Sequence, residues 1–456
     1  MQTLEIFLLL SIFISIFFLI LLNNRQKSIY FLFISILIAI AQFFYDGLRW
    51  QLLPAIYLLP TLFLVYKYRK HKIITPLHRT IIYVWFAVAT FLPWALPVFK
   101  LPVPSGPFNV GTEAFYIVDS SRLEWFTPED LNDHRKLMLQ AWYPSSKSAL
   151  NKPENYMDFM ELRSPALASA GGIPTFTTKH LEKGKTNSYV GLECIESKNG
   201  LPVVIFSHGI TGSRFLHQNL YEHLASNGYV VFALDHSYDS NLTIFPDGSF
   251  ANYRSEITGH PDSISIRNKQ MTTRKSDLIF VINWLYYLNP GSIKSKLNEK
   301  LNLDEISLGG HSFGGATATF ATFEYERIKS CFVLDSWTSP LPGFVIDSGL
   351  RTSFLFVGRP NWNDSDYPKN YLRLDNLLKN STGNKYRLFI ENTLHLDYTD
   401  IPLMSPVVNL FMDIGTLPPK KSLDLINNLV LSFLQEHNLE NKEKLSLILE
   451  NELIRQ

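Results

Sequence analysis

The sequence predicts an α/β protein, with a mostly parallel sheet and helices on both faces, preceded by an N-terminal transmembrane helical segment. The first hundred residues are overwhelmingly apolar and aromatic, whereas the remainder of the 456 residues has the mixed composition of a globular domain. From residue 137 onward, short β-branched and apolar runs alternate with longer segments that mix polar and apolar residues. That alternation is typical of parallel strands joined by helices.

The N-terminal hundred residues contain four apolar runs, at 6–22, 29–45, 52–66 and 81–99. A helix crosses the hydrocarbon core with about 20 residues and needs at least about 17. The first two runs meet this limit, the fourth is expected to meet it as well, and the third is short and contains two prolines. We therefore expect residues 1–100 to form a membrane domain of three or four transmembrane helices, and charge placement favours four.

Basic residues lie in the connections between these runs. Arg25 and Lys27 separate the first run from the second, and five basic residues separate the third from the fourth: Lys67, Arg69, Lys70, Lys72 and Arg79. Short basic loops favour the cytoplasmic side of a membrane. If both loops lie there, the third run must span, and the chain leaves the fourth run on the outer face of the cell membrane. A secretory signal peptide is disfavoured as an alternative, because residues 1–5 lack its basic segment. A buried core helix remains an alternative for the third or fourth run alone.

A proline-rich stretch at residues 101–107 cannot continue a helix and is predicted to be a linker. Residues 108–438 then form the α/β domain, and residues 439–456 a charged C-terminal tail. Its strands are predicted at 137–142, 202–206, 229–234, 305–308, 331–334, 353–357 and 386–390. Its helices are predicted from near Ser213, at 265–288, after Gly314, at 371–378 and at 423–435. Ligands of such sheets bind beyond the carboxyl ends of the strands, where functional residues are therefore expected.

Composition excludes several classes of function. The net charge of +1, without a long basic tract, gives no electrostatic basis for binding nucleic acid. Cys194 and Cys331 are the only cysteines, which is too few for a disulfide framework, and their spacing is not that of a zinc site. Neither metal-ligand spacing nor a glycine-rich phosphate loop occurs, so we expect no metal and no cofactor.

The segment Gly310-His311-Ser312-Phe313-Gly314 carries the strongest functional signal. It follows the strand predicted at 305–308 and precedes a helix of small residues. G-x-S-x-G between a strand and a helix is typical of a nucleophile elbow, which lifts the serine hydroxyl clear of the sheet. Ser312 is therefore the predicted nucleophile, and a purely structural turn is the alternative.

A serine hydroxyl needs a base, and the base needs an acid to orient it. In this arrangement the acid and then the histidine follow the serine along the chain. Asp335 ends the next predicted strand and is the predicted acid. His395 follows the strand at 386–390 and is the predicted base. Asp397 and Asp400 are rival acids that break this order, and the other late histidine, His437, lies near the tail.

Acyl transfer also needs hydrogen-bond donors for the oxyanion. The backbone N–H of Phe313 is one predicted donor, and the N–H of Ile210, in the loop after the strand at 202–206, is the second. His208 and His311 lie near the predicted site and are interpreted as packing or hydrogen-bonding residues rather than as the base. Asp235-His236 is expected to shape the wall of the site.

With these residues the chain resembles the platelet-activating-factor acetylhydrolase family, of the plasma and intracellular type-II kind together with its bacterial relatives, within the α/β-hydrolase superfamily. The resemblance runs from about residue 106 to residue 436. Its matching segments are the elbow, Phe206-Ser207-His208-Gly209, Leu334-Asp335, and His395 followed by Asp397-Tyr398-Thr399-Asp400. The resemblance implies an α/β-hydrolase fold and calcium-independent hydrolysis of a short or oxidised acyl chain at the sn-2 position of a phospholipid. The plasma enzyme lacks the membrane segment.

We therefore expect an integral membrane serine hydrolase that acts on short or oxidised acyl esters of phospholipid-like molecules. A serine peptidase, a general esterase or a polyester hydrolase on the same fold is the alternative, since the same triad serves amides and esters. A non-catalytic membrane receptor on a hydrolase scaffold is an alternative of another class, against which the presence of all three residues argues. Segments 151–198 and 237–262 are rich in turn residues and are either lids or surface insertions.

Overall fold

The computed structural model describes residues 1–68, 74–146, 152–255, 260–363, 367–438 and 452–455. The chain divides into two compact units: unit 1 comprises Met1–Phe99 with Met404–Val407, and unit 2 comprises Lys100–Leu403 with Val408–Gln456. The basic residues Arg69, Lys70 and Lys72 lie outside the described residues. The predicted tail also lies outside them, except at residues 452–455.

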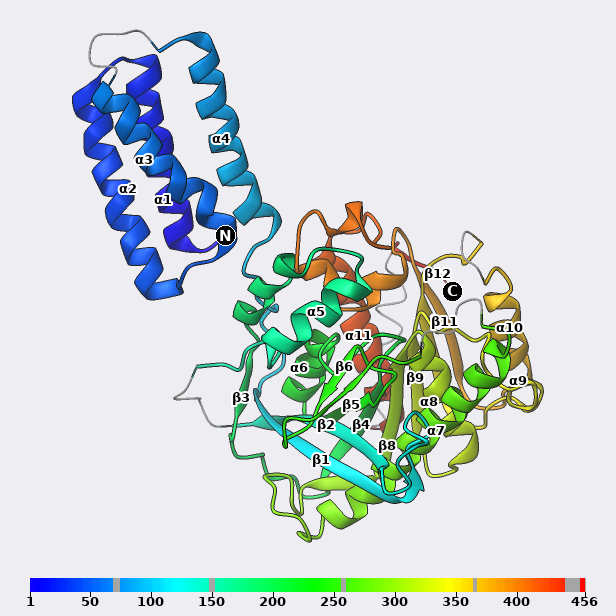
Figure 1. The fold of residues 1–456 in the computed structure, drawn as a ribbon. Coiled ribbons are helices and arrows are strands. Elements are labelled where there is room, and N and C mark those ends of the chain that lie inside the picture. Colours follow the sequence, from blue (N-terminus) through cyan, green and yellow to red (C-terminus); the bar gives the residue numbers. More distant parts are fainter. Residues whose placement is uncertain (69–73, 147–151, 256–259, 364–366, 439–451, 456) are drawn as a thin grey trace. The chain divides into compact units, whose positions relative to one another are not determined.

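The described part of unit 1 consists of helices that pack alongside one another (Figure 1). They are α1 (Thr3–Ile16) with the π-helical turn η1 (Phe17–Leu21), α2 (Arg25–Asp46), the short turn η2 (Trp50–Leu52), α3 (Leu53–Tyr68) and α4 (Pro76–Ala95). Each predicted apolar run thus lies largely on a helix, although residues 96–99 of the fourth run follow the end of α4. Thr3–Leu21 and Arg25–Asp46 are long and apolar enough to cross a membrane. That all four helices span remains a prediction.

A buried ion pair joins three parts of unit 1. The Arg49 guanidinium, in the α2–α3 connection, donates from Nε to Glu5 Oε1 at 2.7 Å and from Nη2 to Glu5 Oε2 at 2.8 Å. Its Nη1 donates to the carbonyl oxygen of Leu96 at the end of α4, at 2.6 Å. Both charged side chains are at most 3 % exposed. The start of α1, the α2–α3 connection and the end of α4 therefore meet at one end of the unit.

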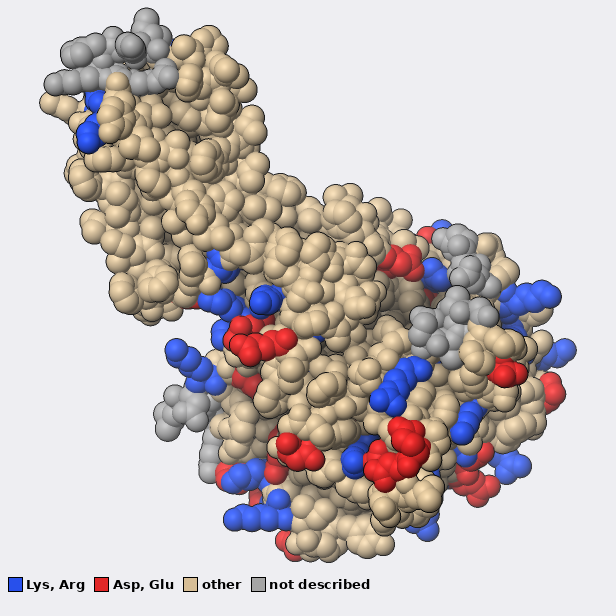
Figure 2. All heavy atoms as spheres, in the orientation of Figure 1, with Lys and Arg blue, Asp and Glu red and all other residues tan. Residues whose placement is uncertain are grey.

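The other end of unit 1 carries described basic residues. Arg25, which begins α2, donates to the carbonyl oxygen of Tyr66 near the end of α3. The α1–α2 connection and the end of α3 therefore lie together, as the placement of both basic loops on one side of a membrane requires. Between the two ends, the face of unit 1 visible in Figure 2 carries no charged side chains, whereas unit 2 displays both signs.

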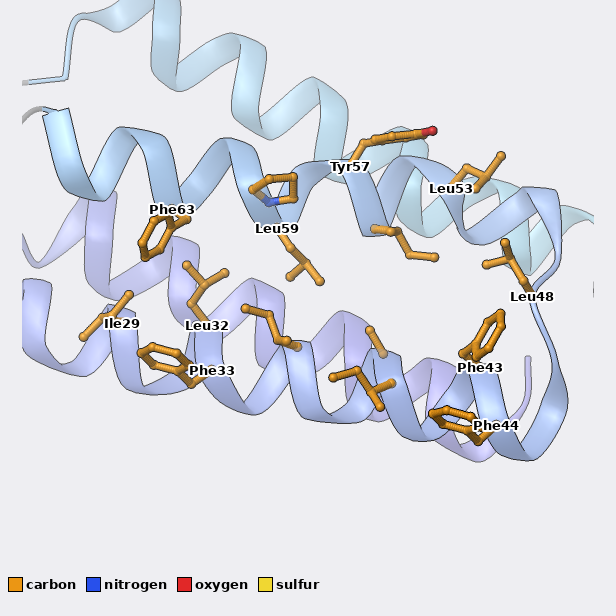
Figure 3. Close-up of a pocket in the computed structure, with 15 residues that line it drawn as sticks. Ile29, Leu32, Phe33, Phe43, Phe44, Leu48, Leu53, Tyr57, Leu59 and Phe63 are labelled. Atoms are coloured by element: carbon orange, nitrogen blue, oxygen red, sulfur yellow. The ribbon is translucent and has the colours of Figure 1, made fainter.

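An apolar groove of about 750 Å³ runs between α2 and α3 (Figure 3). Aromatic side chains from both helices line it, including Phe33, Phe43, Phe44, Tyr57 and Phe63. Phe44 is 81 % exposed and Tyr57 61 %. Large contiguous apolar surfaces are rare on proteins in water, whereas lipid tails cover them without loss. This surface is therefore a large exposed apolar face of unit 1.

Unit 2 is organised around a ten-stranded sheet of order β12-β11-β10-β9-β8-β4-β5-β2-β1-β3 within the described residues. Its strands are β1 (Asn109–Leu123), β2 (His134–Ser145), β3 (Ser188–Val190), β4 (Leu201–Ser207), β5 (Val230–His236), β8 (Leu301–His311), β9 (Ser330–Leu334), β10 (Ser353–Gly358), β11 (Lys385–Ile390) and β12 (Ile454–Arg455). The strands from β5 through β4, β8, β9 and β10 to β11 are parallel. Antiparallel β2 and β12 flank this core.

Helices cover both faces of this sheet (Figure 1). One face packs against α7 (Ser263–Leu288), α8 (Phe313–Glu324), α9 (Gly343–Ser348) and α10 (Asn370–Asn380), and the other against α6 (Gln218–Ser226) and α11 (Pro419–Asn438). In β4, Val203 and Ile205 belong to the first core, and Val204 and Phe206 to the second. A strand buried on both faces must be apolar throughout, which is why β4 reads as a continuous apolar run. The predicted architecture of a mostly parallel sheet with helices on both faces is confirmed.

Each predicted strand and helix of unit 2 is present, with shifted ends. The helix predicted from near Ser213 begins only at Gln218, because residues 208–217 form a loop in which Thr211 has a φ of 56°. The predicted linker at 101–107 is hydrogen-bonded to unit 2, through Leu101 N–H to Lys185 O at 2.9 Å and Gly106 N–H to Ser226 Oγ at 3.1 Å.

The two segments considered as lids contain short elements that sequence patterns did not predict. The first carries α5 (Met160–Ala170), the turns η3 (Thr175–Thr177) and η4 (Lys179–Lys183), and β3. The second carries a small hairpin of β6 (Leu242–Ile244) and β7 (Phe250–Asn252). Further short turns, η5 (His395–Tyr398), η6 (Ile401–Leu403) and η7 (Val408–Leu410), follow β11.

Candidate active site

Ser312 occupies the turn between β8 and α8 with φ 56° and ψ −124°, a conformation that costs free energy for a residue with a side chain. Hydrogen bonds on both sides stabilise it. Ser312 N–H donates to Leu334 O at 3.0 Å, and Trp337 N–H donates to Ser312 O at 3.1 Å. The turn is therefore fastened to the end of the neighbouring strand β9.

The flanking glycines are required by space. A Cβ on Gly310 would lie 2.2 Å from the carbonyl oxygen of Gly314, and a Cβ on Gly314 would lie 2.0 Å from the carbonyl oxygen of Ser207. Neither backbone oxygen can move without breaking the turn or β4. The G-x-S-x-G pattern is thus explained by close approach of α8 to two strands.

Asp335 directly follows β9 and is fully buried. Its Oδ1 accepts hydrogen bonds from the backbone N–H of Arg359 at 3.1 Å and from Trp362 Nε1–H at 3.2 Å. The Nε of Arg359 lies 3.5 Å from its Oδ2, as an ion pair. The orientation of the Asp335 carboxylate is therefore fixed by residues of the segment that follows β10.

His395, the first residue of η5 after β11, lies between Ser312 and Asp335. Its Nδ1 is 2.6 Å from Asp335 Oδ2, and its Nε2 is 3.0 Å from Ser312 Oγ. A carboxylate only accepts, so Nδ1 carries the proton and Nε2 presents its lone pair to the serine hydroxyl. The side chain of His395 is 22 % exposed, and Ser312 is partly exposed, so the reacting atoms are open to solvent.

His311 supports the imidazole of His395 from below the elbow. Its Nε2–H donates to the backbone carbonyl oxygen of His395 at 3.1 Å, and the two ring centroids are 4.7 Å apart. Burial, with His395 and His217 nearby, lowers the pKa of His311 well below its usual value. The ring is therefore neutral, and it serves as a packing and hydrogen-bonding residue, as the sequence predicted.

The rival acids are engaged elsewhere. Asp397 Oδ2 accepts from the N–H groups of Leu394 at 2.7 Å and Gly415 at 2.6 Å. Asp400 Oδ2 accepts from Tyr156 Oη–H at 2.9 Å, and burial raises the pKa of this carboxyl well above its usual value. His437 packs on Phe433 in α11. The structure thus brings together Ser312, Asp335 and His395 and leaves these other candidates outside the cluster.

Of the two predicted oxyanion donors, Phe313 directly follows Ser312 in the chain, and Ile210 follows Gly209, which approaches Ser312 in space. Phe313 is the first residue of α8, so its N–H has no partner within the helix. Ile210 follows Gly209, on which a Cβ would lie 3.1 Å from Ser312 Cβ. Among the described residues, neither N–H has a hydrogen-bond acceptor. Two free amides beside a serine hydroxyl can stabilise a developing negative charge.

Sequence reasoning missed Arg359 and Trp362 because neither belongs to a motif. The signal that could have found them is their position just after the strand β10, next to the strand that carries Asp335. Asp235-His236, predicted as part of the wall, is instead fully buried beneath the loop that carries Ile210.

The described residues contain no group of three or more His, Cys, Asp or Glu side chains that could hold a metal ion. Cys194 and Cys331 are free and buried, and burial raises the pKa of each thiol to about 12. They are unreactive packing residues.

Comparison with known proteins identifies the family of the chain. Residues 97–447 match the family model described as platelet-activating factor acetylhydrolase, isoform II. A platelet-activating factor acetylhydrolase from Gallus gallus is 25 % identical over 264 residues, covering 52 % of this chain and 62 % of that protein. The corresponding protein of Canis lupus familiaris is 26 % identical over 257 residues, covering 52 % and 57 %. The chain thus spans less than two thirds of the length of these curated relatives.

Two further matches cover more. A probable 1-alkyl-2-acetylglycerophosphocholine esterase from Arthroderma benhamiae is 23 % identical over 383 residues, covering 76 % of this chain and 90 % of that protein. The solved structure of a ferulic acid esterase from Streptomyces cinnamoneus has a TM-score of 0.61 and 24 % identity, covering 76 % of this chain and 94 % of that one. The latter similarity shows the fold, and the α/β-hydrolase fold predicted from the sequence is confirmed.

Replacing Trp362 tests whether the groups around Asp335 tune the base. Trp362→Phe removes one donor to Asp335 Oδ1 and leaves the backbone N–H of Arg359. We expect Ser312 to react with a fluorophosphonate about tenfold more slowly, since a hydrogen bond to a charged group contributes about 1.5–3 kcal/mol. Asp335→Asn should lower the rate of the same reaction about 10⁴-fold, because the carboxylate that orients the imidazole is lost. Trp125→Phe, on the far loop after β1, is the control, and equal rates for Trp362→Phe and wild type would contradict the assignment.

Proposed function

The chain belongs to the platelet-activating factor acetylhydrolase, isoform II, family, and from that membership we propose that it is a membrane-anchored serine hydrolase of carboxylic esters. The observation that carries the proposal is the continuous line from Ser312 Oγ through the imidazole of His395 to Asp335 Oδ2, with separations of 3.0 and 2.6 Å. These are hydrogen-bond distances for a nucleophile, a base and an orienting acid.

In the proposed reaction, His395 Nε2 takes the proton of Ser312 Oγ as this oxygen attacks the ester carbonyl carbon. The carbonyl π electrons move to the carbonyl oxygen, which accepts hydrogen bonds from the N–H groups of Phe313 and Ile210. Collapse of the intermediate breaks the bond to the alcohol, which leaves with the proton from His395. Water then attacks the acyl-Ser312 ester in the same way and releases the carboxylic acid. Asp335 stabilises the imidazolium at both stages.

The substrate class follows from the family and from the names of relatives. The Arthroderma relative is named for 1-alkyl-2-acetylglycerophosphocholine, a phospholipid with a two-carbon acyl group. We infer that this chain hydrolyses short or oxidised acyl esters of phospholipid-like molecules. General esterase or polyester hydrolase activity is the runner-up, because the ferulic acid esterase shares the fold.

Anchoring in the membrane is the remaining part of the proposal. Thr3–Leu21 and Arg25–Asp46 have the length and composition of spanning helices, and α3 and α4 complete a bundle whose basic connections share one end. With those connections on the cytoplasmic side, unit 2 follows α4 on the outer face of the cell membrane. Four spans, rather than three, place both basic connections on one side.

The nucleophile is tested by Ser312→Ala. We expect no measurable hydrolysis of p-nitrophenyl acetate above the no-enzyme rate and no labelling by a fluorophosphonate, with unchanged thermal unfolding. Ser307→Ala is the matched control, because Ser307 is buried in the same strand β8 and bonds to Ser330 Oγ at 2.8 Å. Retained turnover in Ser312→Ala would remove the serine mechanism.

The substrate is tested with the detergent-solubilised full chain and glycerophosphocholine esters whose sn-2 acyl group lengthens from two to sixteen carbons. We expect kcat/KM to fall by at least 10² across the series and oxidised, truncated chains to be cleaved like short ones. Long chains cleaved as fast as acetyl would contradict the acyl preference. A fluorogenic peptide panel run beside it should give no turnover, and cleavage there would favour a peptidase.

The membrane assignment is tested by extracting membranes at high pH. The full chain should remain in the pellet after sodium carbonate treatment and enter the supernatant only with detergent. A single-cysteine variant at Ser197, in unit 2, should react with a membrane-impermeant maleimide on intact cells, whereas one at Asn24 should not. Release by carbonate would contradict anchoring, and the reverse labelling would contradict the orientation.

A further inference from the structure

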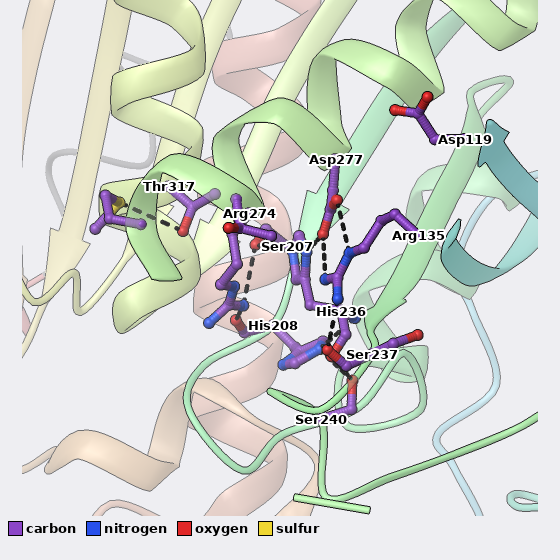
Figure 4. Close-up of polar contacts among 12 residues, drawn as sticks. Asp119, Arg135, Ser207, His208, His236, Ser237, Ser240, Arg274, Asp277 and Thr317 are labelled. Atoms are coloured by element: carbon purple, nitrogen blue, oxygen red, sulfur yellow. Dashed lines mark hydrogen bonds and ion pairs between the residues drawn. The ribbon is translucent and has the colours of Figure 1, made fainter. Parts of the chain in front are cut away.

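A buried polar network includes Ser207, His208, His236, Arg274 and Asp277 (Figure 4). It involves side chains from the ends of β4 and β5 and from α7. His236 Nε2 is 2.9 Å from Ser207 Oγ, and its Nδ1 is 2.9 Å from Asp277 Oδ2. Arg274 donates from Nη2 to the carbonyl oxygen of His208 and to Ser207 Oγ at 3.3 Å. The proposed reaction uses none of these side chains directly.

The protonation of His208 is fixed by its neighbours. Its Nε2 is 3.2 Å from the backbone N–H of His236 and 2.8 Å from Ser240 Oγ. A backbone N–H can only donate, so Nε2 must be the unprotonated acceptor and Nδ1 must carry the proton. Burial, with Arg274 and His236 nearby, lowers the pKa of His208 well below its usual value, in agreement with a neutral ring.

Among the described residues, the proton on Nδ1 has one acceptor, the carbonyl oxygen of Gly209 at 2.6 Å. The same oxygen accepts from the backbone N–H of Gly212 at 3.1 Å. In a trans peptide, the C=O of one residue and the N–H of the next point in opposite directions. Two donors holding Gly209 O on the side of His208 therefore turn the N–H of Ile210 to the opposite side, away from the imidazole of His208.

The other residues of the network hold the imidazole of His208 in one position. Burial alone would raise the pKa of Asp277, but Arg135, with His236 and Arg122, lowers it well below the usual value. Arg135 Nη2 is 2.6 Å from Asp277 Oδ2. The ionised Asp277 orients His236, whose backbone N–H bonds to His208, and Arg274 fixes the carbonyl oxygen of His208 itself.

From this arrangement we propose that His208 is a positioning residue for the oxyanion hole: its Nδ1–H holds the Gly209–Ile210 peptide in the one orientation that directs the Ile210 N–H at the oxyanion. The inference rests on the proposed function, because an oxyanion forms only if Ser312 attacks a carbonyl group. A reversed peptide would present the Gly209 carbonyl oxygen to the developing negative charge and would repel it.

The test compares two amides that reproduce different nitrogens of the ring. The side-chain NH₂ introduced by His208→Asn can occupy the position of Nδ1 and keep the bond to Gly209 O, whereas the longer amide of His208→Gln reaches the position of Nε2 instead. We expect His208→Gln to lower kcat for p-nitrophenyl acetate 10²–10³-fold, the loss that follows removal of one oxyanion donor. His208→Asn should stay within about tenfold of wild type, and KM should change little in both.

Two readouts separate positioning from loss of structure. Rates are divided by the concentration of active sites, titrated to completion with a fluorophosphonate, so unfolded molecules do not count. Affinity for a trifluoromethyl ketone, which binds Ser312 as an oxyanion, should fall by the same factor as kcat/KM. His223→Gln is the control, because His223 is also buried, on α6, and its Nε2 bonds to no other described residue.

Wild-type kcat and inhibitor affinity in His208→Gln, or equal losses in the two variants, would overturn the proposal. If His208→Gln does not fold, Ser240→Ala replaces it. Ser240 Oγ contacts both His208 Nε2, at 2.8 Å, and the carbonyl oxygen of His236, at 3.1 Å. Its removal should lower kcat about fivefold without a change in KM, since one hydrogen bond contributes about 1 kcal/mol, and an unchanged kcat would overturn the proposal. Full activity in Ser312→Ala would instead contradict the proposed function itself.

Discussion

The hydrogen bond between His395 Nδ1 and Asp335 Oδ2 is the interaction on which the candidate site depends. It decides which nitrogen of the imidazole carries the proton, and only with the proton on Nδ1 does Nε2 have a lone pair for Ser312 Oγ. The two residues come from different strands, β9 and β11, which the parallel sheet ends at the same edge. Residues that are far apart in the chain therefore come close together because their strands end at the same edge of the sheet. The proposed chemistry depends on this part of the fold.

The same edge explains what the sequence could and could not predict. Ser312 lies in a motif, and Asp335 and His395 follow apolar strands in the order that this fold uses, so strand prediction was enough to find them. Trp362 and Arg359 follow a strand too, but no pattern distinguishes a residue that bonds to Asp335 from any other loop residue. β1 was missed although residues 114–118 form a continuous apolar run, because the alternation of strands and helices becomes clear in the sequence only from residue 137 onward. Helix α5 was missed because it contains Pro165 and lacks an amphipathic pattern.

In unit 1, the composition of the sequence was enough to predict the helices, but it could not predict the polar contacts between them. Glu5 and Arg49 are isolated charges in an apolar sequence, and nothing in their spacing indicates a pair. In the fold they form a bidentate pair, and each removes the cost that the other would have alone in an apolar interior. A lone buried charge would be strongly destabilising, so the two residues are explained only together. The pair fixes which helix ends meet, a topological fact that hydropathy does not contain.

The described part of unit 2 contains two Ser–His–Asp series of contacts, and the contrast between them indicates why Ser312, and not Ser207, is the proposed nucleophile. Ser207, His236 and Asp277 have the same sequence of contacts as Ser312, His395 and Asp335, at 2.9 and 2.9 Å. All three are fully buried, however, and Ser207 lies inside β4 with Arg274 Nη2 at 3.3 Å from its Oγ. The carbonyl group of a substrate cannot reach the buried Ser207 hydroxyl. The guanidinium of Arg274, and not a pair of free backbone N–H groups, lies next to that hydroxyl. Ser312 differs by its position on a strained turn outside the sheet, so the backbone geometry of the elbow, and not the three side chains alone, separates the series of contacts that we propose to be catalytic from the structural one.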